Sequence, residues 1–327
     1  MESIHAIEIV VNQFLQSLGM WLAVPFQAIT FLGDEEFFIL LLSALYWSVN
    51  QAVGLKVAVT LLLANSTNAF FKFLFRTPRP FWFSDSVVGF HSESSFGLPS
   101  GHSQLPASVW GWLAVEVKKK WFTIIALVII FLIGISRIYL GLHFLTDVLL
   151  GWTLGGLLVW ALSAFIKKKG NWLAGQSAGQ KILLITLAMV VLVVMNLTAR
   201  WGAAAWVMPT DWAARAGEID PFSLDGTFTM AGTWFGMLTG YVWLTEKRGL
   251  FKASGGGWKR IVRFALGLVG ILILWFGLGL IFPRGANLLS YALRFIRYSL
   301  TGWWATWIAP LVFEKLGVLE FLDQKAL

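Results

Sequence analysis

The 327-residue chain contains no cysteine. This absence excludes disulfide bonds, thiolate metal sites and a cysteine nucleophile, although it does not identify the cellular compartment. Histidine is also scarce, with four residues in the sequence. The first twenty residues lack the basic start and the small-residue cleavage site of a secretory signal, so we expect no removable signal peptide.

Charged residues are few as well: they make up 13% of the chain, against roughly 25% in average proteins. Hydrophobic residues reach 57%, and several apolar runs of about 17–25 residues are long enough to cross a bilayer. Because a backbone in lipid must satisfy its own hydrogen bonds, these runs predict an all-α, polytopic membrane helical bundle. The formal charge is +8. In a membrane protein we expect basic residues to set the orientation of the chain and to contact anionic headgroups, so we expect no nucleic-acid partner.

The apolar runs predict ten membrane spans after an amphipathic segment, residues 1–15, which we expect to lie in the membrane interface. The spans are placed near residues 17–33, 37–49, 53–71, 100–117, 121–140, 143–166, 182–199, 227–245, 261–282 and 288–312. A polar linker over residues 170–180 is the predicted domain boundary. It separates a catalytic membrane domain, residues 1–169 with motifs at 72–147, from a helical region, residues 170–327, whose role is not predicted.

The distribution of basic residues predicts the orientation in the membrane. If the ten spans alternate, one side carries twice as many lysines and arginines as the other. The positive-inside rule places that richer side in the cytoplasm. We therefore predict a multi-pass protein of the cell (inner) membrane, with the conspicuous polar residues of its first half on the outer (periplasmic, extracellular or luminal) face.

The polar stretch from Arg137 to Asp147 contains the residues best suited to chemistry. His143 and Asp147 are four residues apart, so they share a face if the stretch is helical. A carboxylate in that position can fix one imidazole nitrogen and leave the other free to attack. Arg137 ends a long apolar run, and ionisable groups so close to hydrocarbon are functional candidates.

Three basic residues in the first half suit a multiply charged oxyanion such as phosphate. Lys72 supplies a point charge, while Arg79 and Arg137 supply planar guanidinium groups. No carboxylate cluster in this part of the sequence suggests Mg²⁺ or Ca²⁺ ligands. We therefore expect no metal, and we expect these cations to stabilise transition-state charge instead.

The sequence Pro99-Ser100-Gly101-His102 is typical of a helix start, with Ser100 as the N-cap. The free N–H groups and the dipole of such a start favour an anion, and Gly101 lets the backbone approach it closely. His102 and His143 together supply a general acid and a nucleophile. These are the minimum for cleaving a phosphoester through a covalent intermediate.

Each feature also has an ordinary structural explanation. Lys72 can be a helix end that reaches the headgroups, and the prolines around Arg79 can mark a turn-rich loop. Ser100 can be a simple cap, and His143 with Asp147 can be a buried structural pair. Their joint occurrence on one face favours an enzyme site, with a transporter path as the alternative from another functional class.

Three motifs carry a resemblance to a known family: Lys72 with Arg79-Pro80, Pro99-Ser100-Gly101-His102, and Ser136-Arg137 with His143 and Asp147. Over residues 30–166 the chain resembles the type 2 phosphatidic acid phosphatase superfamily, in particular its integral-membrane lipid phosphate phosphatase branch. The resemblance implies a six-helix core. About four additional C-terminal transmembrane helices lie outside it.

The resemblance also implies a role for each motif residue. His143 would attack phosphorus and form a phosphohistidine, Asp147 would orient its imidazole, and His102 would protonate the leaving oxygen. The phosphoryl oxygens would be bound by Lys72, Arg79, Ser100, Gly101 and Arg137. Hydrolysis would need no metal or other cofactor. Arg76 and His91 match no motif position and are left out of the site.

Membrane spans on both sides of the motifs favour a substrate whose tail stays in lipid. The candidates are phosphatidate, phosphatidylglycerophosphate, a sphingoid base phosphate and a polyprenyl diphosphate, and the expected reaction is hydrolysis of the phosphomonoester or diphosphate. A sugar-phosphate phosphatase and a phosphotransferase on the same core are the alternatives. The oligomeric state is not predicted.

Overall fold

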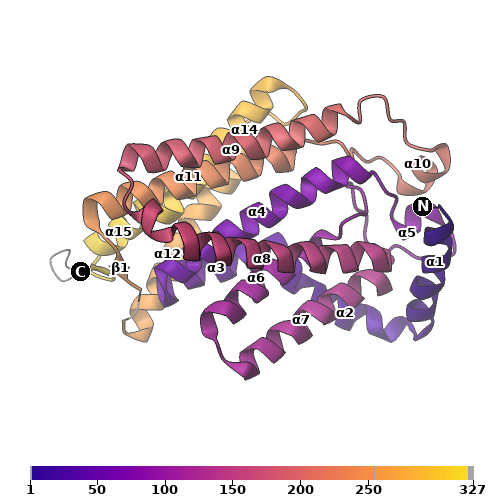
Figure 1. Ribbon diagram of the computed structural model, residues 1–327, viewed down its shortest axis with the longest axis horizontal. Coiled ribbons are helices and arrows are strands. Elements are labelled where there is room, and N and C mark those ends of the chain that lie inside the picture. Colours follow the sequence, from indigo (N-terminus) through magenta and orange to yellow (C-terminus); the bar gives the residue numbers. More distant parts are fainter. Residues whose placement is uncertain (1, 254, 323–327) are drawn as a thin grey trace. The chain divides into compact units, whose positions relative to one another are not determined.

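A computed structural model describes residues 2–253 and 255–322 (Figure 1). The helices are α1 (Glu2–Ser17), α2 (Ala23–Thr30), α3 (Glu35–Ala44), α4 (Gln51–Phe75), α5 (Pro80–Phe83), α6 (Gly101–Val117), α7 (Lys120–Tyr139), α8 (Leu145–Ala174), α9 (Ala178–Trp201), α10 (Thr210–Ala216), α11 (Asp225–Arg248), α12 (Gly257–Leu272), α13 (Leu278–Ile281), α14 (Leu288–Trp303) and α15 (Ala309–Lys315). Two-residue strands, β1 (Phe251–Lys252) and β2 (Glu320–Phe321), pair antiparallel. The all-α prediction is confirmed.

Short segments of other helix types connect or extend these elements. The 3₁₀ segments are Met20–Leu22 and Phe31–Gly33, and the π-helical segments are Leu45–Val49, Ile273–Gly277 and Trp304–Ile308. The predicted region of about four additional C-terminal helices contains α9, α11, α12 and α14 as its long members. The expected extension beyond the motif-bearing half is therefore present.

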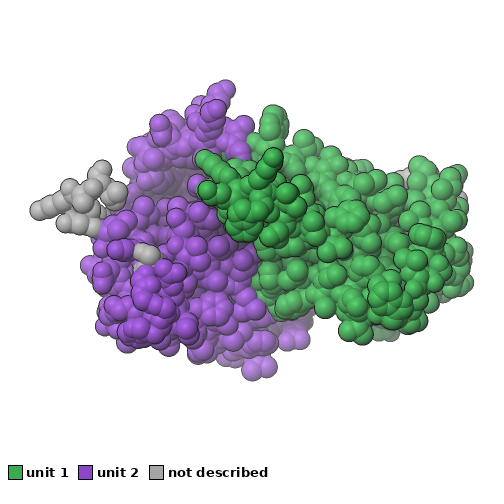
Figure 2. Space-filling view, turned by 90° about the horizontal axis from the view of Figure 1, so that it is seen from below, with its two compact units in different colours: residues 1–38, 63–162, 195–223 green, residues 39–62, 163–194, 224–327 purple. Residues whose placement is uncertain are grey.

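The chain forms two compact units, each assembled from three segments (Figure 2). Unit 1 comprises residues 1–38, 63–162 and 195–223, and unit 2 comprises residues 39–62, 163–194 and 224–327. All the residues predicted for the site belong to unit 1. The division of the chain after residue 169 stays a prediction.

Five helical stretches in the described chain are long and apolar enough to cross a membrane: Gln51–Phe83, Lys120–Tyr139, Leu145–Ala174, Ala178–Trp201 and Gly257–Ile281. A sixth candidate joins Ser3–Ser17 to Met20–Gly33, with a bend of 88° between them. Five of the ten predicted spans coincide with the first set. The other five are helical too, but they are shorter, bent or more polar than a simple spanning helix.

The predicted linker over residues 170–180 is mostly helical in the structure, which corrects the sequence interpretation. Helix α8 continues past the three lysines to Ala174, and α9 begins at Ala178. Lysine is a good helix former, and one glycine in a helix costs only about 1 kcal/mol relative to alanine. The lysines therefore end the apolar run without ending the helix.

Two glycines let α8 pack closely against the start of α6 within unit 1. A Cβ at Gly151 would lie 2.8 Å from the Cβ of Ser103, and a Cβ at Gly155 would lie 2.7 Å from the Cβ of Ala107. Small residues four apart are the usual means of close helix contact in membranes. This contact fixes the first turn of α6 relative to α8, the two helices that carry His102 and Asp147.

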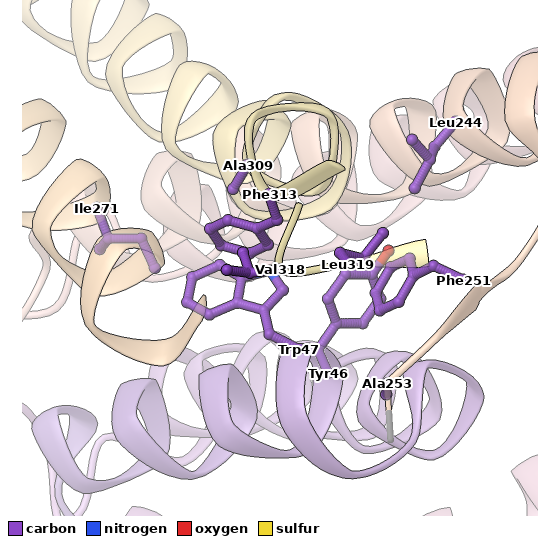
Figure 3. Close-up of a cluster of buried hydrophobic side chains, with 10 residues drawn as sticks. All are labelled: Tyr46, Trp47, Leu244, Phe251, Ala253, Ile271, Ala309, Phe313, Val318 and Leu319. Atoms are coloured by element: carbon purple, nitrogen blue, oxygen red, sulfur yellow. The ribbon is translucent and has the colours of Figure 1, made fainter. Parts of the chain in front are cut away.

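Unit 2 has its own hydrophobic cluster, shown in Figure 3. The side chains of Tyr46 and Trp47 come from the π-helical segment before α4, and Phe313 comes from α15. The indole N–H of Trp47 donates to the carbonyl of Ala305 at 2.8 Å, so this buried polar group is satisfied. Unit 2 therefore has a packed core of its own.

We expect Gly155→Leu to lower the thermal midpoint of the purified protein clearly, because its side chain would overlap α6. Overpacking a close contact costs about 1–3 kcal/mol. The matched control is Gly156→Leu, since a Cβ at Gly156 meets nothing within 4 Å. Equal thermal midpoints for the two variants in the same detergent would contradict the close α6–α8 contact.

Candidate active site

The elements of unit 1 bring the predicted site residues together from four parts of the chain. Lys72 lies in the last turn of α4, and Arg79 directly precedes α5. His102 lies in the first turn of α6, and Arg137 lies in the last turn of α7. Asp147 lies in the first turn of α8 and is fully buried.

His143 lies in the turn between α7 and α8, and not on a helix as the spacing had predicted. Its Nδ1 is nevertheless 3.1 Å from Oδ2 of Asp147, and the same oxygen accepts the N–H of Phe144 at 3.0 Å. The turn depends on Gly141, whose φ of +70° is in the left-handed region. A Cβ there would also lie 2.2 Å from the carbonyl oxygen of Val88.

The protonation of His143 follows from its two partners. Nη1 of Arg79 lies 3.1 Å from Nε2 of His143, and an arginine can only donate. Nε2 must therefore carry the lone pair, and the proton sits on Nδ1, where it is donated to Asp147. Burial, together with the nearby charges of Arg79 and Lys72, holds the pKa of His143 well below its ordinary value, which also favours this neutral form.

Arg79 and Lys72 are anchored by the loop that precedes α6. Nε of Arg79 donates to the carbonyl of Ser95 at 2.7 Å, and its Nη1 donates to the carbonyl of Leu142 at 3.0 Å. Nζ of Lys72 donates to the hydroxyl of Ser95 at 2.9 Å and to the carbonyl of Phe96 at 2.6 Å. These neutral acceptors thus hold both cations in fixed directions, and Arg79 has an acidic partner besides.

Glu93 joins the two arginines and was not identified from the sequence. One carboxylate oxygen pairs with Nη2 of Arg79 at 3.4 Å, and the other pairs with Nη2 of Arg137. Burial alone would raise the pKa of Glu93, but Arg79 and Arg137 hold it well below its ordinary range. An anion is therefore already favoured at the point where the two guanidinium groups meet.

His102 pairs with Asp34, a second acidic residue that the sequence did not reveal. Nε2 of His102 lies 2.6 Å from Oδ1 of Asp34, which precedes α3. The side chain of His102 remains 24% exposed. A carboxylate at this distance orients the ring and gives its protonated form a counter-ion.

Helix α6 begins directly after Ser100, as predicted, but the side chain of Ser100 makes no capping hydrogen bond. Ser100 is the N-cap, and its backbone N–H donates to the carbonyl of Asp147 at 3.0 Å. Among the described residues, the buried hydroxyl of Ser100 and Nε of Arg137 have no hydrogen-bond partner. A Cβ at Gly101 would meet only Asn68, at 3.5 Å, so close packing within the protein does not by itself require glycine there.

The cluster as a whole is suited to a tetrahedral oxyanion. It combines one lysine, two arginines and a helix start, and these converge on a neutral imidazole. Residues 2–253 and 255–322 contain no group of three or more acidic or histidine side chains placed to hold a metal ion. Arg76 and His91, which were left out of the site, take no part in the contacts described above.

Family comparisons match most of the chain. A family model described as PAP2 superfamily matches residues 53–171. A second, described as PAP2 superfamily phosphatase, transmembrane extension, matches residues 228–321. The first contains all the predicted motif residues, and the second covers much of the C-terminal region.

Individual relatives match different shares of the chain. Phosphatidylglycerophosphatase B of Bacillus subtilis (strain 168) is 47% identical over 85 residues, 23% of this chain and 42% of that protein. Glucose-6-phosphatase 3 of Homo sapiens is 27% identical over 187 residues, 50% of this chain and 54% of that protein. The chain thus spans about half the length of these two relatives. Glucose-6-phosphatase 3 of Mus musculus is 25% identical over 354 residues, 98% of each chain.

One solved structure is also similar, a transmembrane PAP2 type phosphatidylglycerolphosphate phosphatase from Bacillus subtilis. It is 30% identical, with a TM-score of 0.45. The match covers 51% of this chain and 88% of that one.

We expect Arg137→Gln to weaken binding of inorganic phosphate about 10-fold or more, because a buried charge-assisted contact is lost. The control is Arg76→Gln, which removes the same charge from a residue outside the cluster and should leave the affinity unchanged. Isothermal titration of the detergent-solubilised protein with phosphate measures both. Equal affinities would show that the cluster does not bind the oxyanion through Arg137.

Proposed function

The chain belongs to the PAP2 superfamily, and we propose that it is an integral-membrane phosphatase that hydrolyses lipid phosphates through a phosphohistidine intermediate. The observation that carries this proposal is the state of His143. Its Nδ1 is tied to Asp147, and its Nε2 keeps a lone pair beside Arg79. A neutral imidazole that is held in one orientation and surrounded by cations is suited to nucleophilic attack on phosphorus.

In the first step, Nε2 of His143 forms a bond to phosphorus as the bond from phosphorus to the leaving oxygen breaks. The electron pair of that bond goes to the leaving oxygen, which takes a proton from His102. Asp147 balances the positive charge that develops on the imidazole of His143. His102 is then neutral, with Asp34 beside it. In this state His102 can act as the base in the second step.

In the second step, a water oxygen attacks phosphorus and gives a proton to His102. Nε2 of His143 leaves with its electron pair, and inorganic phosphate is released. Both enzyme groups return to their starting protonation states, so the cycle closes. A lipid or sugar hydroxyl in place of water would give the phosphotransferase alternative, which the same residues support.

Lys72, Arg79, Arg137 and the helix start at Ser100 would carry the charge of the phosphoryl oxygens in both steps. Their fixed directions mean that little reorganisation is needed at the moment of reaction. The unpartnered hydroxyl of Ser100 and Nε of Arg137 are available for such oxygens. We therefore propose that the reaction needs no metal.

For the substrate we propose a phosphate ester whose apolar tail stays in the bilayer. Support comes from the membrane helices on both sides of the motifs and from the 47% identity to a phosphatidylglycerophosphatase over 85 residues. An undecaprenyl-diphosphatase of Sulfolobus acidocaldarius and a human sphingosine-1-phosphate phosphatase are also relatives. Phosphatidylglycerophosphate is the first substrate to try.

A sugar phosphate is the second candidate. Its support is the match to mouse glucose-6-phosphatase 3 over 98% of both chains, which includes the C-terminal helices. A soluble substrate would need no lateral access from lipid. Relative rates on phosphatidylglycerophosphate and glucose 6-phosphate decide between the two classes.

We expect His143→Ala to lower phosphate release at least ~10³-fold, since loss of a nucleophile typically costs that much or more. Release is measured in detergent with EDTA on a panel of phosphatidate, phosphatidylglycerophosphate, sphingosine 1-phosphate, undecaprenyl diphosphate and glucose 6-phosphate. His91→Ala is the control, an exposed histidine outside the motifs. Activity that persists in His143→Ala, or that EDTA abolishes in the wild type, contradicts the mechanism.

His102→Ala should impair phosphomonoester substrates more than diphosphates, because a diphosphate leaving group needs less protonation. The ratio of kcat values for phosphatidate and undecaprenyl diphosphate, in variant and wild type, measures this difference. Equal losses on the two substrates would count against His102 as the general acid.

A further inference from the structure

Helix α1 buries several of its polar side chains and exposes several of its apolar ones. Ile7 and Phe14 are 71% and 63% exposed, whereas Asn12 is 0% and Glu8 is 6% exposed. In a membrane protein the outward apolar side suits the lipid interface. The inward side is less ordinary, because buried polar groups are costly unless they find partners.

The partner of Asn12 is the turn that carries His143. The side-chain amide of Asn12 donates to the carbonyl of Ile138 at 2.8 Å and to the carbonyl of His143 at 3.2 Å. The first carbonyl lies near the end of α7, where it also accepts the N–H of Gly141, and the second lies just before α8. One amide therefore ties both ends of the turn together.

Two further residues of α1 bind the helix ends on either side of the turn. Oε1 of Glu8 accepts the backbone N–H of Thr146 at 2.7 Å, and its other oxygen accepts the hydroxyl at 3.1 Å. The side chain of Gln16 donates to the carbonyls of Tyr139, at 2.9 Å, and of Val88, at 2.8 Å. The bonds from Gln16, Asn12 and Glu8 thus reach the chain at Tyr139, at Ile138 and His143, and at Thr146.

Apolar and ring contacts complete the attachment. The ring of His5 stacks on Phe144, with centroids 4.4 Å apart, and Ile9 packs in the same cluster with Val87. Beyond the end of α1, the hydroxyl of Tyr139 donates to the carbonyl of Gly19 at 2.9 Å. Residues 5–19 therefore contact the turn at His143 and Phe144 and the helix ends beside it at Tyr139 and Thr146.

We propose that α1 is a positioning element for the nucleophile and that Asn12 is its principal positioning residue. The turn includes Gly141 in a left-handed conformation, so its own sequence restrains it weakly. The bonds from Asn12 hold the carbonyl of His143, and without them the backbone there has fewer restraints, so Nε2 is directed less precisely toward bound phosphate. This inference rests on the proposed function in one respect, which is that His143 is the nucleophile.

The test is Asn12→Leu, which keeps the side-chain size and removes both donors. We expect kcat to fall about 10- to 100-fold, since a displacement of the reacting atom near 1 Å has effects of that size. KM and the affinity for inorganic phosphate should change by less than about threefold, because Lys72 and Arg137 are untouched. The control is Gln13→Leu, an exposed amide one residue further along α1.

Hydrogen exchange provides a readout that does not depend on activity. Amides of residues 139–146 should exchange faster in Asn12→Leu than in Gln13→Leu, while the rest of unit 1 keeps its protection. Gln16→Leu is a second, milder variant, because Gln16 is half-buried, and we expect smaller changes in the same direction. It keeps the question open to experiment if Asn12→Leu folds poorly.

The outcomes separate this inference from the proposed function. A wild type that hydrolyses no substrate of the panel removes the proposed function, and hydrogen exchange then still decides whether α1 orders the turn. An active wild type together with full kcat in Asn12→Leu and Gln16→Leu overturns the positioning role. Loss of kcat and phosphate affinity together, with protection lost throughout unit 1, also overturns it, because Asn12 would then serve only the fold.

Discussion

The site depends on one hydrogen bond, from Nη1 of Arg79 to Nε2 of His143. Because arginine has no lone pair to offer, this contact determines which nitrogen of the imidazole keeps its lone pair. Asp147 completes the assignment from the other side of the ring. The buried cations around His143 act in the same direction, since they oppose a positive charge on its ring.

Burying three cations side by side requires compensation, and the structure supplies it largely from backbone and hydroxyl oxygens. The carbonyls of Ser95 and Phe96 accept from Lys72 and Arg79, so the loop before α6 is part of the site. Glu93 contributes the single carboxylate that spans both guanidinium groups. Neutral acceptors orient Lys72 without cancelling its charge, whereas Glu93 partly offsets the charges of the two arginines.

The sequence revealed the motif residues because their chemistry is local: a basic helix end, a helix cap, and a histidine and a carboxylate four residues apart. It did not reveal Asn12 or Glu93, whose partners lie 131 and 44 residues away in the chain. A single polar residue in an amphipathic helix or a loop has no periodic signature. The helix now named α8 was predicted to end near residue 166, but it continues to Ala174. A run of lysines marks the edge of an apolar segment, but it does not mark the end of a helix.

Helix α8 also sets a length scale for the site. It extends over 30 residues from Leu145 to Ala174, which is about 45 Å at the usual helical rise. This length exceeds the ~30 Å thickness of bilayer hydrocarbon. Because Asp147 lies in the first turn of α8, a bilayer-spanning α8 would carry this carboxylate at the level where the hydrocarbon ends. Chemistry at a phosphate headgroup requires this depth, because the headgroup lies where the hydrocarbon stops.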